Sequence, residues 1–219
     1  MKKILCLLFV LLPLAGCGPK PMPWIEAGYQ RMENFKTDFL TGRPPIVTDM
    51  HFAKAVEEIK KSGDLDLLGK LWLTRMALQV AVLEEPEDGE YPRIEAAQPV
   101  PANRDFYLFL KGNAAVDRAL LPAQYRAFLS ALQGGNTTET EITVAKIDDS
   151  LSRLIAAGLA VRGHAENEAL LRMAVETASR NGWKRALLAW LNRLAVFYEA
   201  SGEAAKASAV RQRIDLITS

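Results

Sequence analysis

The sequence has few of the side chains that metal sites and nucleophilic enzymes use. Only two cysteines, Cys6 and Cys17, and two histidines, His51 and His164, occur among 219 residues. The histidines are far apart, and the His-x-x-x-His spacing of a zinc site is missing. Neither a Gly-x-Ser-x-Gly motif nor a phosphate-binding or dinucleotide-binding glycine loop occurs. We therefore predict no metal, no cofactor and no catalytic residue, and we expect that the protein is not an enzyme.

Two groups of acidic residues remain as candidates for metal binding or acid–base chemistry. The first group lies at residues 84–90. The order of its residues does not match an EF-hand, so we favour a solvated acidic loop over a calcium site. Asp148 and Asp149 form the second group, and adjacent side chains on a helix diverge by about 100°, which prevents a general acid–base pair. The first group consists of Glu84, Glu85, Glu87, Asp88 and Glu90.

An excess of charge of either sign is also absent. The formal net charge is +1, and it becomes −1 when Lys2 and Lys3 are left out. Such a balance provides no electrostatic footprint for nucleic acid. Apolar residues make up 49% of the chain and charged residues 24%, which is typical of a folded globular protein.

The amino terminus has the three-part pattern of a secretory signal peptide. Two lysines precede an apolar run over residues 4–12, which is too short for a hydrocarbon layer that requires about 20 residues. The following Leu14-Ala15-Gly16-Cys17 resembles the lipobox of bacterial lipoproteins, and the resemblance covers residues 1–17. It implies a signal peptide of residues 1–16 and a diacylglyceryl thioether on Cys17. The alternative is an ordinary signal peptide that ends in a chance cysteine.

Lipidation at Cys17 implies a membrane-anchored protein without a free thiol or a disulfide, because Cys6 is removed with the signal peptide. Two or more acyl chains are sufficient for stable anchoring. Residues 17–23 contain three prolines and predict an extended tether. By resemblance to lipoprotein sorting in diderm bacteria, Gly18 lacks the aspartate that retains such proteins at the inner membrane. This implies the periplasmic face of the outer membrane.

Nearly every later segment shows the 3.6-residue period of an amphipathic helix, and none shows the sustained alternation of a strand. We therefore predict an all-α protein of antiparallel helical hairpins, with about seven to nine helices. The proline-rich segment 85–102 predicts a long loop. This loop would separate an N-terminal helical subdomain (24–84) from a C-terminal one (103–219).

Several residues predict where helices begin. Asp49, Asp64 and Asn103 are candidate N-caps, because a short polar side chain before an apolar periodic run can accept a free helical N–H. Thr138 and Glu141 have the spacing of a capping box. We expect this box to begin one long helix that reaches about residue 159.

The segment from Leu188 to about Ser219 resembles a tetratricopeptide repeat, a helix–turn–helix unit of 34 residues. It departs from the family at Arg211, where an aromatic residue is usual, at Ile214, where alanine is preferred, and at Ser219, where a proline closes the unit. Repeats need several copies to share a core. Two interpretations therefore stay open, a short superhelix with divergent upstream repeats and a generic helical hairpin. The matching residues are Leu191, Leu194, Ala195, Tyr198, Gly202 and Ala207.

The resemblance also implies a binding surface. In the tetratricopeptide family, ligand peptides lie against the inner face of the first helix of each unit. Transferred to this sequence, the partner-binding positions are Asn192, Val196 and Glu199. The alternative is that these three side chains merely face solvent.

These observations predict a periplasmic lipoprotein that acts as a protein–protein interaction adaptor or assembly factor in the cell envelope, with membrane lipid and an envelope protein as its partners. Two other functions stay open. A peptidoglycan-acting enzyme would need a buried carboxylate with a raised pKa near residues 85–102. A protein that binds a small apolar ligand would use Trp183, Trp190 and Tyr198 as the lining of its pocket.

Overall fold

The computed structural model describes residues 22–219, and this part of the chain forms eleven helices and no strand. The predicted all-α fold of antiparallel helical pairs is confirmed, whereas the predicted number of seven to nine helices is too low. The predicted signal peptide, the predicted lipidation residue Cys17 and the predicted tether up to residue 21 lie outside the described residues. The helices are α1 (Pro23–Thr41), α2 (Pro45–Lys60), α3 (Leu65–Ala81), α4 (Tyr91–Ala97), α5 (Pro101–Leu110), α6 (Ala123–Gln133), α7 (Thr137–Ala145), α8 (Ser150–Arg162), α9 (Glu168–Arg180), α10 (Lys184–Ala200) and α11 (Ala204–Thr218).

One additional helix lies in the segment that we predicted to be a long loop. Residues 85–102 contain α4 and the start of α5, so the uninterrupted loop of the prediction is wrong. Pro92 and Pro101 lie in the first turns of these two helices, where a missing N–H costs nothing. Because Pro92 and Pro101 were assigned to the loop, the prediction missed α4 and placed the start of α5 too late.

The other additional helix comes from a break in the long helix predicted after Thr138. Helix α7 ends at Ala145, and Asp149 caps a new helix by accepting the N–H of Ser152 on Oδ2 at 2.7 Å. The N-cap of α7 is Asn136, whose Oδ1 accepts the N–H of Glu139 at 3.0 Å. The capping box was therefore placed two residues too late, and the acidic pair at 148–149 includes a helix cap.

The three other predicted N-caps have different outcomes. Asp64 is the N-cap of α3, with its Oδ1 accepting the N–H of Leu67 at 3.0 Å, as predicted. Asp49 and Asn103 are not caps, because α2 already begins at Pro45 and α5 at Pro101. In both cases a proline with its fixed φ begins the helix earlier than the polar residue suggested.

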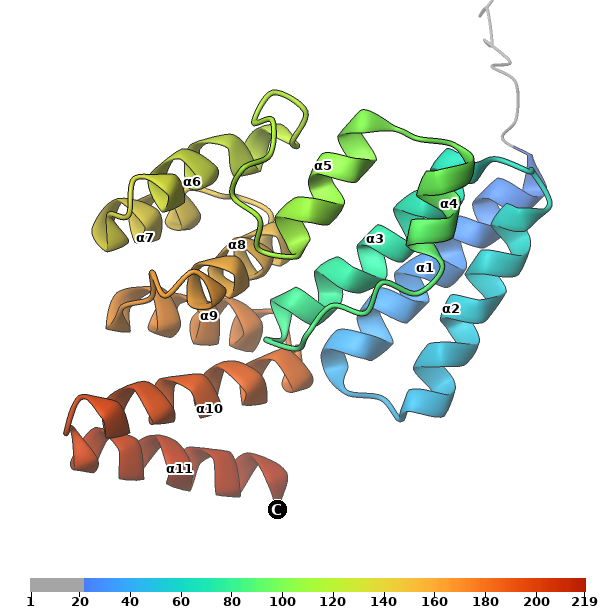
Figure 1. Cartoon of the computed structure of the whole chain (residues 1–219). Coiled ribbons are helices and arrows are strands. Elements are labelled where there is room, and N and C mark those ends of the chain that lie inside the picture. Colours follow the sequence, from blue (N-terminus) through green and yellow to red (C-terminus); the bar gives the residue numbers. More distant parts are fainter. Residues whose placement is uncertain (1–21) are drawn as a thin grey trace, which may run out of the picture.

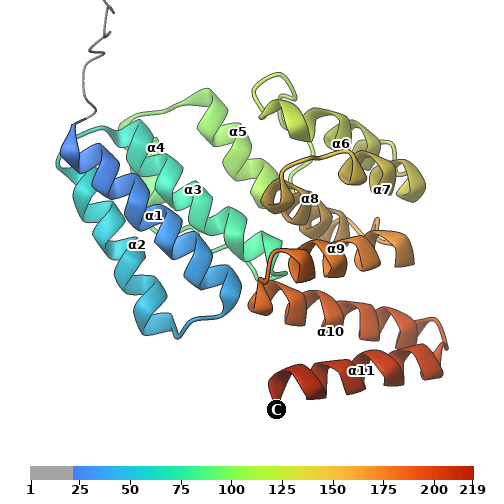
Figure 2. The same cartoon turned by 180° about the vertical axis from the view of Figure 1, so that it is seen from behind.

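Helix α3 is the central element of the fold. It packs against the antiparallel pair α1 and α2 on one side and against α4 and α5 on the other, and its C-terminal half crosses α8 (Figures 1 and 2). The chain then continues through α9, α10 and α11, which lie side by side with α11 outermost (Figure 1). None of the described helices is both long and apolar enough to cross a membrane.

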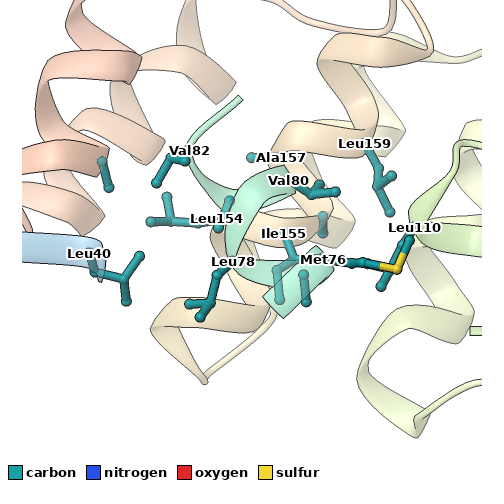
Figure 3. Close-up of a cluster of buried hydrophobic side chains, with 14 of the residues drawn as sticks. Leu40, Met76, Leu78, Val80, Val82, Leu110, Leu154, Ile155, Ala157 and Leu159 are labelled. Carbon is teal, nitrogen blue, oxygen red and sulfur yellow. The ribbon is translucent and has the colours of Figure 1, made fainter. Parts of the chain in front are cut away.

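The core is continuous from α1 to α11, so the two predicted helical subdomains share one set of buried side chains. At its centre, α3 and α8 approach closely at Gly158, where a Cβ atom would lie 2.3 Å from the carbonyl oxygen of Val80. Figure 3 shows the apolar side chains that surround this crossing. They include Met76, Leu78 and Val80 of α3, Val82 directly after it, and Leu154, Ile155 and Leu159 of α8, with Leu40 and Leu110 from α1 and α5.

Candidate functional site

The three predicted partner-binding residues lie on one solvent-exposed face of α10, which we call the α10 outer face. Val196 is 41% exposed, and Asn192 and Glu199 are exposed on either side of it. Arg211 of α11 connects these two residues. Its Nη1 donates to Asn192 Oδ1 at 3.0 Å, and its Nε and Nη2 donate to Glu199 Oε1 at 3.2 and 3.1 Å. The structure therefore brings the predicted residues together, with an added guanidinium group.

A larger concave surface lies between α9, α10 and α11, and we call it the α9–α11 groove. Its volume is about 920 Å³. Its lining residues come from one face of α9, from Leu194 of α10 and from Arg213 of α11. We call the apolar residues Met173, Val175 and Leu194 the floor, and the charged residues of α9 and α11 the two walls. The α9 residues that line it are Glu168, Ala169, Arg172, Met173, Val175, Glu176, Ser179 and Arg180.

The floor of the groove is apolar and its walls are charged. Leu194 is only 5% exposed and Val175 is also buried, whereas Met173 is half-buried beside them. A ligand in the groove would therefore meet a narrow apolar strip with charged groups along its edges. This arrangement resembles the apolar centre and polar rim of a protein–protein interface.

Glu168 forms a fixed corner at one end of the groove. Its Oε1 accepts the phenol O–H of Tyr198 at 2.8 Å, and its Oε2 lies 3.2 Å from the ammonium group of Lys206. The hydrogen bonds from Tyr198 and Lys206 lower the pKa of Glu168 and keep its carboxylate ionised. Arg172 also pairs with this carboxylate, at 3.5 Å.

The other charged residues of the groove have fewer ion-pair partners than Glu168. Arg180 and Glu176 form an ion pair within α9. Arg213, on the other wall, forms no ion pair with any residue in the described part of the chain. No local sequence pattern indicates this groove, because it combines one face of α9 with a single arginine more than thirty residues later in the chain.

The acidic group at residues 84–90 connects helices to one another. The carboxylate of Glu84 accepts from Arg185 Nη2 at 2.6 Å, and its backbone carbonyl accepts from Arg162 at the same distance. Asp88 lies 3.2 Å from Lys111 Nζ. Each of these cations comes from a different helix or helix end, so the group joins α5, α8 and α10 to the end of α3.

Neither histidine lies in a cluster of potential metal ligands among the described residues. His51 Nδ1 lies 3.0 Å from Asp38 Oδ2, which connects α2 to α1. His164 is exposed and has a positive φ of 54° in the turn after α8. Among the residues that the structure describes, no group of three or more His, Cys, Asp or Glu side chains is arranged to hold a metal ion.

The aromatic residues considered as a ligand pocket belong to the core. Trp190 is fully buried, and its Nε1–H donates to the carbonyl oxygen of Ala81 at 2.9 Å. Tyr198 is also buried and uses its hydroxyl on Glu168. Trp183 is half-buried and is the N-cap residue of α10. Trp190 and Tyr198 are thus already committed to partners within the chain.

A carboxylate adapted to act as a general acid would have a raised pKa. The pKa of Asp66 moves in the opposite direction, mainly because Lys70 donates to it at 2.6 Å, with a further hydrogen bond from Asn103 at 2.7 Å. The pKa of Glu168 is lowered as well. Both groups are therefore held in the ionised form, as expected for structural ion pairs.

Comparison with known proteins finds no matching family model, no matching curated protein and no matching solved structure. The interpretation of function therefore depends on the geometry of the groove and the α10 outer face, together with the amino-terminal sequence pattern.

Proposed function

We propose that the protein is a lipid-anchored adaptor of the cell envelope, which binds another envelope protein and performs no chemical step itself. The observation that carries this proposal is the α9–α11 groove, with its buried Leu194 and Val175 and its arginine-lined walls. Grooves between helices are a recurrent way of binding an amphipathic segment of another protein. The location follows from the lipobox resemblance, which supports an acylated Cys17 at the periplasmic face of the outer membrane.

We also propose that α10 and α11 form one tetratricopeptide-like unit. Gly202 has a φ of 74° in the turn between the two helices, a conformation that favours glycine. Helices α10 and α11 pack against each other, and Ala195 and Ala207 are both buried, as small residues are in such a unit. Arg211 departs from the family pattern, and here it contacts the α10 outer face instead of filling the hairpin interior.

The anchor is tested by replacing Cys17 with serine. We expect the Cys17→Ser protein to lose labelling by palmitate and to stay an uncleaved precursor of higher mass, because serine cannot form the thioether that precedes cleavage. Cys6→Ser is the matched control, since this residue is removed with the signal peptide and its substitution should leave the mature protein unchanged. Palmitate labelling of the Cys17→Ser protein, or the absence of palmitate from the wild-type protein, would disprove the anchor.

The adaptor function is tested by photocrosslinking in intact cells of the native host. A photoreactive amino acid is placed at Ser179 in the groove, at Val196 on the α10 outer face and at Lys54, which is exposed on α2. We expect a discrete crosslinked protein from Ser179 and none from Lys54. The absence of protein crosslinks from both Ser179 and Val196, or peptidoglycan cleavage by the purified full-length protein, would refute the proposal.

A further inference from the structure

We propose that the segment bound in the α9–α11 groove is an acidic amphipathic helix of the partner protein. This inference rests on the proposed adaptor function and specifies the chemistry of the partner. The three observations that carry it are the charge of the groove, the apolar strip on its floor and its length between helical walls.

The charge of the chain is distributed unevenly. Residues 166–219 contain eight Lys and Arg against six Asp and Glu, a net charge of +2. Residues 22–165 contain 16 against 20, a net charge of −4. The part of the molecule that contains the groove is thus positive, and the rest of the described chain is negative. This uneven distribution favours the approach of an acidic partner to the C-terminal helices over its approach to the rest of the described chain.

The local charges of the groove favour the same partner. Three of its lining residues are arginines, and both of its carboxylates, Glu168 and Glu176, already pair with groove arginines. The side chains of Arg172 and Arg180 are 68% and 74% exposed. A guanidinium group has five N–H donors, so each can still bind a carboxylate from outside. Arg213 has no ion-pair partner among the described residues and lines the groove from α11, whereas Arg172 and Arg180 line it from α9.

The shape of the groove favours a helix over an extended segment. The lining residues of α9 extend from Glu168 to Arg180, which corresponds to about 18 Å along a helix axis, or a partner helix of about 12 residues. The walls are helices, whose backbone groups are paired internally and offer no ladder to an added strand. An extended segment would leave its own N–H and C=O groups unpaired over the apolar floor, whereas a helix pairs its own.

The expected partner helix therefore has apolar side chains on one face, directed toward Leu194, Met173 and Val175, and Asp or Glu residues along both edges of that face. Carboxylates on one edge would meet Arg172 and Arg180 of α9. Carboxylates on the other edge would meet Arg213 of α11. This pattern can be recognised in the sequence of any crosslinked peptide.

The test uses the full-length lipidated protein with the photoreactive residue at Ser179, and the crosslinked segment of the partner is identified by mass spectrometry. We expect a segment of net negative charge with apolar residues at helical spacing. Substituting Arg180→Glu and Arg213→Glu together should reduce crosslinking at least tenfold. The matched control, Arg180→Lys with Arg213→Lys, keeps the charge and should retain most of the crosslinking. Circular dichroism verifies that both variants are folded, as expected for exposed side chains.

The other outcomes contradict the inference in distinguishable ways. A basic or neutral crosslinked segment, or crosslinking that survives the double glutamate substitution, would overturn the acidic helix while leaving the adaptor function intact. Crosslinks from Val196 alone would assign the partner to the α10 outer face and would likewise overturn it. If neither position crosslinks to a protein, the adaptor function itself fails, and the inference fails with it.

Discussion

Replacing Gly158 with alanine is expected to destabilise the protein by about 3 kcal/mol, near the upper end of the range for overpacked cores. The added Cβ atom would lie 2.3 Å from the carbonyl oxygen of Val80 and 3.2 Å from its carbonyl carbon. These atoms belong to the backbone of α3, so no side-chain rotation relieves the contact. The helices α3 and α8 would have to move apart, and the apolar contacts around their crossing would loosen (Figure 3).

Two other glycines provide matched comparisons. At Gly134, φ is −71° and the nearest atom to an added Cβ is the Ala131 carbonyl oxygen of the same helix, at 3.4 Å. Gly134→Ala should therefore be neutral or slightly stabilising. At Gly28 the obstacle is the Cδ1 atom of Ile59 at 2.7 Å, the end of a flexible side chain, so the cost should be intermediate. Urea unfolding of the three variants measures their losses of stability, which we expect to be largest for Gly158→Ala and smallest for Gly134→Ala. Equal midpoints for Gly158→Ala and the wild type would contradict the close crossing.

The helical fold could be predicted from the sequence because its signals are local. The apolar periodicity of each helix, the Asp64 cap and the glycines that end helices all act within a few residues of one another. The errors are local as well. The prolines of α4 and α5 lie at helix starts, not at helix ends. Asp149 begins a new helix within a segment whose apolar periodicity predicts one continuous helix. In each case the same residue type permits two local structures.

The groove could not be predicted from the sequence, because it depends on where separate helices are placed. Arg213 and Arg172 line the same groove only after α11 has packed against α10 and α10 against α9. The acidic segment provides a similar example. Glu84 pairs with Arg185, which is 101 residues away, and no local pattern indicates that this carboxylate fastens α10 to α3. By contrast, Asn192, Val196 and Glu199 share one helix, and their common face follows from its period.

Trp190 joins the C-terminal helices to the end of the central helix α3. It is fully buried, and its indole N–H donates to the carbonyl oxygen of Ala81 at the end of α3, 109 residues away, at 2.9 Å. Trp190→Ala should cost about 3–5 kcal/mol, because it creates a large cavity. It also leaves a buried carbonyl group without its donor, which adds to the cost.

Trp190→Phe separates these two contributions, since phenylalanine keeps much of the apolar volume but has no N–H. We expect it to cost about 1–3 kcal/mol, mostly from the unsatisfied Ala81 carbonyl. Trp183→Phe is the control, because Trp183 is only half-buried and should tolerate the change. Denaturant unfolding gives the total costs, and hydrogen exchange locates them. If α10 transmits its stability through Trp190, amide protection in Trp190→Phe should fall more in α10 and α11 than in α1 and α2. An equal loss throughout would instead mean that the C-terminal helices unfold only together with the whole core.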